Sequence, residues 1–379
     1  MKNKYLIIII PFLIFGCSGH YQKDSVLIEI ENENNSPAFC EIKINKIIPL
    51  ETTDSSILGK ITKIQKYEDK WYVFDFLHNR SIVCFNKDGE YRYHVSRGKG
   101  PGEIITPSDF YVHKDKLFIK DNNCMAIYEH KNGEFIDKIK TNNLLFNKFI
   151  ISQSDNILTF GYSPPKKIIE KDKIKPNVVK ESINLYKLLN NNYEETKYFL
   201  KGNYEFKYFV PHKPISKFGD HLLCLYPPST EIYNYHKGDV KLAYKIDFGE
   251  NSFRKHELNK DIDFYISRIK EKKRIGFIDD INETSDFISF SFVKNIGEKS
   301  FALFSKKSHN TVKFKLLLKN NKLPDMSILS TFNDQFIGVF YPSKIEKKEL
   351  KQLSKKWNLP DTLTQFSNPV VVIFRLTEK

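Results

Sequence analysis

The residues best suited to chemistry lie in one glycine-rich segment, Arg97–Glu103, with the sequence RGKGPGE. Glycine reaches positive φ and lets the backbone approach a ligand closely, whereas proline fixes its own φ and carries no N–H group. Such a loop can surround an anion, with Arg97 and Lys99 as charged donors and with Glu103 accepting backbone N–H bonds. We therefore name Arg97, Lys99 and Glu103 as candidate ligand-binding residues. A tight structural turn is the simpler interpretation, and we favour it.

The segment does not match the loops that bind nucleotides. A Walker loop needs Gly-Lys-Ser/Thr at the start of a helix, whereas Gly100 is followed by Pro-Gly-Glu. A dinucleotide fingerprint also needs a helix after its strand, and the next predicted element here is a strand at 109–112. We exclude both kinds of site.

No other pattern in the sequence predicts catalysis. The motifs HExxH and GxSxG are absent from the sequence. His212 and His221 flank a predicted turn, which is weak evidence for a metal. Asp75 and Asp121 occupy equivalent places in two neighbouring repeats, where aspartates typically cap turns. A single active site would need only one copy. We predict no catalytic residue, no metal site and no cofactor.

The N-terminus has the pattern of a bacterial lipoprotein signal. Lys2 and Lys4 precede an apolar run over 6–15, which is shorter than the roughly 20 residues that span a membrane. Residues 14–17, Ile-Phe-Gly-Cys, resemble a lipobox, so we expect Cys17 to be acylated. An uncleaved anchor or a plain secretory peptide is the alternative. We predict a polar tether over 18–38 and the main domain over 39–379.

The composition favours strands and gives no evidence for nucleic-acid binding. The 379 residues include 31 Phe and 20 Tyr, which suit half-buried pleated surfaces. The net charge of +14 could indicate a nucleic-acid partner. However, the lysines are scattered over predicted turns and strand edges, where they prevent edge-to-edge pairing. The remaining cysteines form no CxxC pair, and Cys84 and Cys224 are expected to be buried. An exported protein can form disulfides, but the sequence does not say which cysteines would pair.

A repeat of four strands organises the chain. Strands are predicted over 61–64, 71–75, 81–86 and 90–95, then over 109–112, 117–121, 125–130 and 134–139. The turn glycines Gly89 and Gly133 are 44 residues apart. A period of about 40–45 residues with four strands in each repeat is typical of a propeller blade.

Four further blades complete a predicted ring of six. Their strands lie within 149–200, 221–248, 287–318 and 328–376, and the first of these carries an insertion over 163–180. The sixth blade lacks one strand, which we assign to 41–50 near the N-terminus. Two short helices are predicted over 253–275 and 343–358, the second opening with a capping box at Ser343–Glu346. An open array of β-sandwiches is the alternative.

Three segments together resemble a known family. They are 48–59 (IPLETTDSSILG), the Asp88-Gly89 turn and the loop Arg97–Glu103. Their order is similar to that in six-bladed β-propeller lipoproteins of Gram-negative anaerobes, which are related in shape to NHL-type propellers. The likeness is clear over residues 40–140. After residue 140 it is diffuse and consists only of the pattern of strands and turns. It implies an all-β six-bladed propeller, exported and lipid-anchored, and it implies no activity.

The leading functional hypothesis is a membrane-anchored exported propeller that binds a ligand or a protein without catalysis. The alternative is a hydrolase or lyase that acts on a glycan or other envelope substrate at the central channel, and a third is a structural subunit of an envelope complex. Converging carboxylates would favour an enzyme, whereas a channel of apolar and lysine side chains would disfavour it. The expected partners are the membrane, through the lipid, and an envelope protein or glycan. Residues 18–24 lack an acidic run, so we expect an outer-membrane position facing the periplasm.

Overall fold

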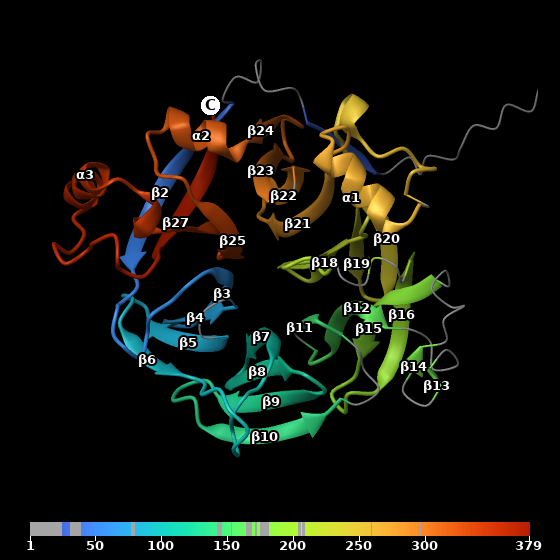
Figure 1. Ribbon diagram of the computed structural model, residues 1–379, viewed down its shortest axis with the longest axis horizontal. Helices are drawn as coiled ribbons and strands as arrows, with labels where there is room; N and C mark the ends of the chain where they lie inside the picture. The colour runs from blue at the N-terminus through green and yellow to red at the C-terminus, as the bar shows by residue number, and fades with distance from the viewer. Residues whose placement is uncertain are drawn as a thin grey trace, which may run out of the picture.

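The computed structural model describes residues 25–30, 39–76, 80–141, 146–152, 154–163, 169–170, 173–174, 182–203, 206, 209–258, 260–295 and 297–379. These residues form six mainly antiparallel sheets of four or five strands, arranged as a ring (Figure 1), and one small two-stranded sheet. The predicted all-β, six-bladed propeller is confirmed. In each blade the strands lie side by side, ordered from an innermost strand at the centre of the ring to an outermost strand at its edge (Figure 1).

The first two blades have the predicted four strands each. The first consists of β3 (Ile61–Tyr67), β4 (Lys70–Asp75), β5 (Ser81–Asn86) and β6 (Tyr91–His94). The second consists of β7 (Pro107–His113), β8 (Lys116–Asp121), β9 (Cys124–Glu129) and β10 (Phe135–Lys140). Gly89 in the β5–β6 turn has φ +93°, and a Cβ there would lie 2.1 Å from the Pro49 carbonyl oxygen. Glycine is therefore required where this turn meets the N-terminal strand.

The third and fourth blades carry additions. The third consists of β11 (Lys148–Ile151), β12 (Ile157–Ser163), β15 (Ser182–Leu189) and β16 (Glu195–Asn203), and its insertion holds a small hairpin of β13 (Ile169–Glu170) and β14 (Lys173–Ile174). The fourth consists of β17 (Ile215–Phe218), β18 (His221–Leu225), β19 (Glu231–His236) and β20 (Asp239–Asp247). A fifth strand, β1 (Val26–Glu29), pairs in parallel with β20. The predicted tether over 18–38 thus contributes a strand, because Ile28 is fully buried there.

The last two blades close the ring. The fifth consists of β21 (Gly276–Glu283), β22 (Phe287–Asn295), β23 (Glu298–Ser305) and β24 (Thr311–Lys313). The sixth joins β25 (Ser327–Phe332), β26 (Gln335–Phe340) and β27 (Val370–Glu378) to β2 (Cys40–Pro49). The antiparallel β2–β27 pairing confirms that an N-terminal strand completes the last blade.

The core lies between adjacent blades. Tyr72 and Phe74 of β4, for example, pack against Phe110 of β7 and Ile119 of β8, and all four are buried. The aromatic residues therefore fill the wedge between two sheets, where each large side chain contributes about 1.5–3 kcal/mol through burial. Cys84 and Cys224 are buried as expected, and all four described cysteines are free.

The described residues contain three helices outside the sheets, where two were predicted. The helix α1 (Ile262–Lys270) begins at Asp261, whose side chain accepts a bond from Phe264 N. The helix α3 (Lys347–Trp357) follows a 3₁₀ turn over Pro342–Lys344; another such turn spans Gly249–Asn251. The predicted capping box is wrong, because the helix begins at Glu346, which makes no side-chain cap bond.

The helix that was not predicted replaces the end of a predicted strand. The strand expected over 311–318 ends at Lys313, and α2 (Phe314–Asn320) follows it. Phe314, Leu317 and Leu318 have helical spacing, and as a helix all three become buried in the apolar cluster between the fifth and sixth blades. In the part of the chain that the structure describes, no helix is long and apolar enough to cross a membrane.

Candidate functional site

The glycine-rich loop connects the first blade to the second. Gly98 N donates to Ile104 O at 2.9 Å, and Gly100 N donates to Glu103 Oε2 at 2.7 Å. A Cβ on Gly98 would lie 2.0 Å from Glu103 Oε2, so the glycine leaves room for this carboxylate. Glu103 thus stabilises the loop through a backbone N–H bond, as the sequence led us to expect.

The candidate ligand-binding residues of this loop lie away from the cavities of the central channel. Arg97 Nε donates to Ile105 O at 3.3 Å, and Gly102 packs on Phe135 of the outer strand β10. Among the described residues that line the two cavities considered below, none comes from Arg97–Glu103. Ligand binding by Arg97, Lys99 and Glu103 therefore stays a prediction that is separate from the channel.

The two repeated aspartates support the entry into each blade. Asp75 Oδ2 accepts from Gly59 N at 2.9 Å, and Asp121 Oδ1 accepts from Thr106 N at 2.6 Å. Both carboxylates are buried. Each one binds the backbone that leads into the first strand of its own blade, which explains why the residue recurs with the repeat.

The principal cavity lies in the central channel, among the first strands of five blades. It has a volume of about 450 Å³ and is lined by parts of β3, β7, β11, β17 and β25. Figure 1 labels β3, β7, β11 and β25 around the centre of the ring. Five lysines contribute to its wall, whereas the described lining includes one carboxylate, that of Asp109. These lysines are Lys63, Lys66, Lys148, Lys213 and Lys217. Basic side chains therefore outnumber acidic ones in the wall of this cavity.

Lys63 is held in the wall by an ion pair. Its Nζ donates to Asp109 Oδ1 at 2.7 Å and to Phe110 O at 2.6 Å. The ammonium also lies 5.7 Å from the ring centroid of Tyr111 and 6.0 Å from that of Phe149. Burial lowers the pKa of Lys63, and Asp109 opposes that shift.

Lys213 is the most perturbed base in the cavity. Its backbone N–H donates to Asp279 Oδ1 at 3.1 Å, and its Nζ donates to Asn282 Oδ1. Burial and, to a smaller extent, repulsion from Lys63 lower the pKa of Lys213 to about 7. The attraction of Asp280 offsets only part of this shift. An anion in the cavity would favour the charged form of Lys213, because its negative charge would counteract both the burial of the ammonium group and its repulsion by Lys63.

A second cavity of about 390 Å³ adjoins the first and shares His212 and Leu329 with it. His212 Nδ1 lies 2.6 Å from Asp279 Oδ2, and Lys299 Nζ lies 3.0 Å from that oxygen and 2.5 Å from Asp280 Oδ2. Burial raises the pKa of Asp279, but Lys299 and His212 outweigh it and hold the pKa well below its usual value. The Lys299 ammonium thus occupies the space that a cation would need.

Sequence reasoning located neither the channel lysines nor this cluster. The two histidines considered together contact different carboxylates. His221 Nε2 lies 3.0 Å from Glu283 Oε2, whereas His212 contacts Asp279. The missed signal is positional: Lys63, Lys148 and Lys217 all lie in the first strand of a blade. Aligning these strands by the repeat would have placed the three lysines together at the channel.

Comparison with known proteins fixes the family. A family model described as a domain of unknown function, DUF4934, matches residues 28–375. The chain belongs to this DUF4934 family. A comparison with curated proteins gave no match.

The fold of this DUF4934 protein also occurs in solved structures. The crystal structure of a candidate exported protein from Bacteroides fragilis NCTC 9343 is similar with a TM-score of 0.71 at 16% identity, over 93% of this chain and 99% of that one. The WD40 repeats of RRP9 give 0.46 at 10% identity, over 89% and 100% of the two chains. A luciferin-regenerating enzyme gives 0.42 at 10% identity, over 87% and 95%. At these identities the first likeness shows the fold alone, and the other two carry no argument.

Proposed function

We propose that this protein is an exported, lipid-anchored propeller whose central channel binds an anionic ligand without catalysing a reaction. The excess of lysines over carboxylates in the principal cavity carries the proposal. A volume of about 450 Å³ falls within the range of roughly 300–1,000 Å³ that is common for small-molecule sites. Like charges gathered in a partly enclosed space are unfavourable until a counter-charge enters.

The wall of the cavity favours an acidic saccharide among anions. Tyr111, Phe149 and Phe332 line it together with the lysines. Aromatic faces offer apolar contact to the C–H face of a sugar ring, and ammonium groups bind a carboxylate or a sulfate on the same ring. Lys213 and Lys148 are the donors that we expect to contact the charged group, because Lys63 is already paired with Asp109.

A ligand screen by thermal unfolding tests this proposal. Oligosaccharides that contain uronic acids, sulfated oligosaccharides and inorganic phosphate are compared with neutral oligosaccharides of equal length. We expect a rise in Tm with the acidic sugars that saturates and that decreases with added salt, since ligand binding stabilises the folded state by mass action. Equal shifts with neutral sugars, or none with any anion, would contradict the proposal.

Export and anchoring form a separate part of the proposal. The signal-like segment and the likeness to a candidate exported protein support export, whereas Cys17 lies outside the described residues. Cys17→Ser is expected to abolish acylation and to release the protein from membrane fractions. If the variant stays in the membrane fraction although its signal peptide has been cleaved, another anchor exists.

A second candidate function is a hydrolase or lyase that acts on an acidic glycan. The observation that favours it is Lys213, whose pKa of about 7 provides a neutral amine near physiological pH, beside the His212–Asp279 pair. A neutral lysine can serve as a general base. Mass spectrometry of acidic oligosaccharides after incubation decides the matter. Cleaved products that disappear with Lys213→Met would establish the enzyme and replace the binding function.

A further inference from the structure

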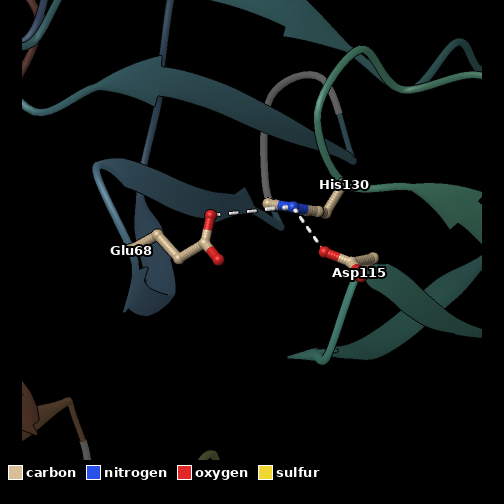
Figure 2. A group of neighbouring side chains, drawn as sticks. All are labelled: Glu68, Asp115 and His130. Atoms are coloured by element: carbon tan, nitrogen blue, oxygen red, sulfur yellow. Dashed lines mark ion pairs between the residues drawn. The ribbon is translucent and has the colours of Figure 1, made fainter.

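A buried histidine lies between two exposed carboxylates at the junction of the first and second blades (Figure 2). His130 follows β9 and is 0% exposed. Glu68 lies in the β3–β4 turn, and Asp115 lies in the β7–β8 turn. His130 Nε2 is 3.8 Å from Glu68 Oε2 and 3.6 Å from Asp115 Oδ1. These three side chains contribute to neither cavity of the channel.

The other ring nitrogen of His130 is held by a buried tyrosine. The Tyr72 hydroxyl lies 3.0 Å from His130 Nδ1 and 2.8 Å from the His130 carbonyl oxygen. The same carbonyl oxygen also accepts from the Tyr93 hydroxyl at 2.8 Å. We assign the Tyr72 proton to the shorter of its two contacts, the one with the carbonyl oxygen, so Nδ1–H of His130 donates to the phenol oxygen. With this proton on Nδ1, the imidazole carries its lone pair on Nε2, which faces the two carboxylates.

Nε2 has no hydrogen-bond partner among the described residues, although it is buried. An unsatisfied buried polar atom costs about 1–3 kcal/mol and is uncommon in native proteins. The distances to both carboxylates are too long for hydrogen bonds. They agree better with a shared ion, because two metal–ligand bonds of about 2.1 Å at a tetrahedral angle separate the ligand atoms by roughly 3.4 Å.

We propose that His130 Nε2, Glu68 and Asp115 bind a divalent transition-metal ion of the Zn²⁺ class. One imidazole with two carboxylates suits Zn²⁺ better than Mg²⁺ or Ca²⁺, which prefer oxygen ligands alone. The two carboxylates neutralise the ion, and their exposure opens a path for it from solvent. Tyr72 supports the ligand nitrogen from the opposite edge of the ring, as partners of metal-bound histidines commonly do.

The proposed ion connects two blades. Glu68 belongs to the first blade, whereas Asp115 and His130 belong to the second. Since the three ligands meet only in the folded ring, the ion stabilises the folded state by mass action. The contrast is the His212–Asp279–Asp280 cluster, where the Lys299 ammonium already lies between the carboxylates.

Calorimetry and thermal unfolding of the full chain, freed of metal by EDTA and dialysed, test the proposal with ZnCl₂ as the probe. We expect one tight equivalent of Zn²⁺ and a saturable rise in Tm, with no such rise from MgCl₂ at the same concentration. The double variant Glu68→Gln/Asp115→Asn should bind Zn²⁺ at least tenfold more weakly. The matched control, Glu349→Gln/Asp361→Asn, makes the same charge change at exposed positions in and after α3, far along the chain from the three ligands, and should bind like the unaltered protein.

Imidazole NMR of the unaltered protein adds a readout that does not depend on the folding of a variant. Zn²⁺ should shift the His130 Nε2 resonance at one equivalent and leave a protonated Nδ1. Absence of saturable Zn²⁺ binding would overturn the proposal. Equal Zn²⁺ affinity in Glu68→Gln/Asp115→Asn, or an unshifted His130 resonance, would also overturn it.

Discussion

Asp109 pairs with Lys63 across the interface of the first two blades, with Lys63 Nζ 2.7 Å from Asp109 Oδ1. The second oxygen, Oδ2, accepts from Phe149 N of the third blade at 2.9 Å. One buried carboxylate thus joins the first strands of three consecutive blades. It also neutralises one of the five lysines around the principal cavity and leaves the others to attract a ligand.

Removing this carboxylate should destabilise the ring. Asp109→Ala leaves the Lys63 ammonium unpaired in the wall, and we expect it to lower the free energy of unfolding by about 3 kcal/mol, as is usual when one partner of a buried pair is lost. Urea denaturation measures the change. The exposed pair Lys46–Asp88 supplies the control, because Asp88→Ala removes a solvated carboxylate and should change stability little. A loss in Asp109→Ala no larger than in Asp88→Ala would contradict the role of Asp109.

The low pKa of Lys213 makes ligand binding depend on pH. Burial, reinforced by Lys63, lowers this pKa from 10.5 to about 7 in the free protein. Only the protonated amine attracts an anion, so affinity for an acidic saccharide should fall as pH rises above 7, by up to about tenfold per pH unit. Calorimetry from pH 6 to pH 9 measures the slope, which should be shallower in Lys213→Met. An equal slope in the two proteins would show that another group titrates.

The same pKa predicts how stability changes with pH when no ligand is present. Between pH 7 and pH 10.5 the unfolded chain binds more protons at Lys213 than the folded chain does. The contribution of this lysine to the free energy of unfolding should therefore rise with pH across that window. The difference between the unaltered protein and Lys213→Met, followed by urea denaturation at several pH values, isolates it. A difference that stays constant with pH would contradict the lowered pKa.

The two N-terminal strands should differ in importance. A chain that begins at Phe39 lacks β1 and loses the burial of Ile28 against the fourth and fifth blades. It should still fold, with the free energy of unfolding lowered by about 2–3 kcal/mol. A chain that begins at Leu50 lacks β2, so β27 becomes an open edge and aggregation is expected. Size-exclusion chromatography and thermal unfolding compare the two, and equal behaviour would refute the role of β2 in closure.

The sequence predicted the ring because its signals are local and repeated. The turn glycines Gly89 and Gly133 recur with the blade period, and alternating apolar residues mark the strands between them. Closure by 41–50 followed from a missing strand in the last repeat. The errors arose where a short apolar stretch suits either secondary structure: 314–318 forms a helix because tertiary packing, not strand propensity, decides there.

The candidate sites could not be predicted in the same way, because they depend on residues that are distant in the sequence. Lys63, Lys148 and Lys213 meet only after three blades have assembled. Likewise, Glu68 and His130 are 62 positions apart, and the lone pair of His130 depends on the Tyr72 hydroxyl. By contrast, the loop Arg97–Glu103 is conspicuous in the sequence because its chemistry is contiguous, and the structure explains its glycines through the position of Glu103.

The most direct measurement of the central claim compares two sets of variants with the best acidic saccharide from the screen. Calorimetry determines its affinity for Lys148→Met/Lys213→Met, in the channel, and for Arg97→Met/Lys99→Met, in the glycine-rich loop. Both double variants remove two positive charges, so the change in net charge is matched. Binding in the channel predicts at least a tenfold loss of affinity in the first and less than a twofold change in the second. The reverse pattern, or equal losses in both, would contradict an anion site in the channel.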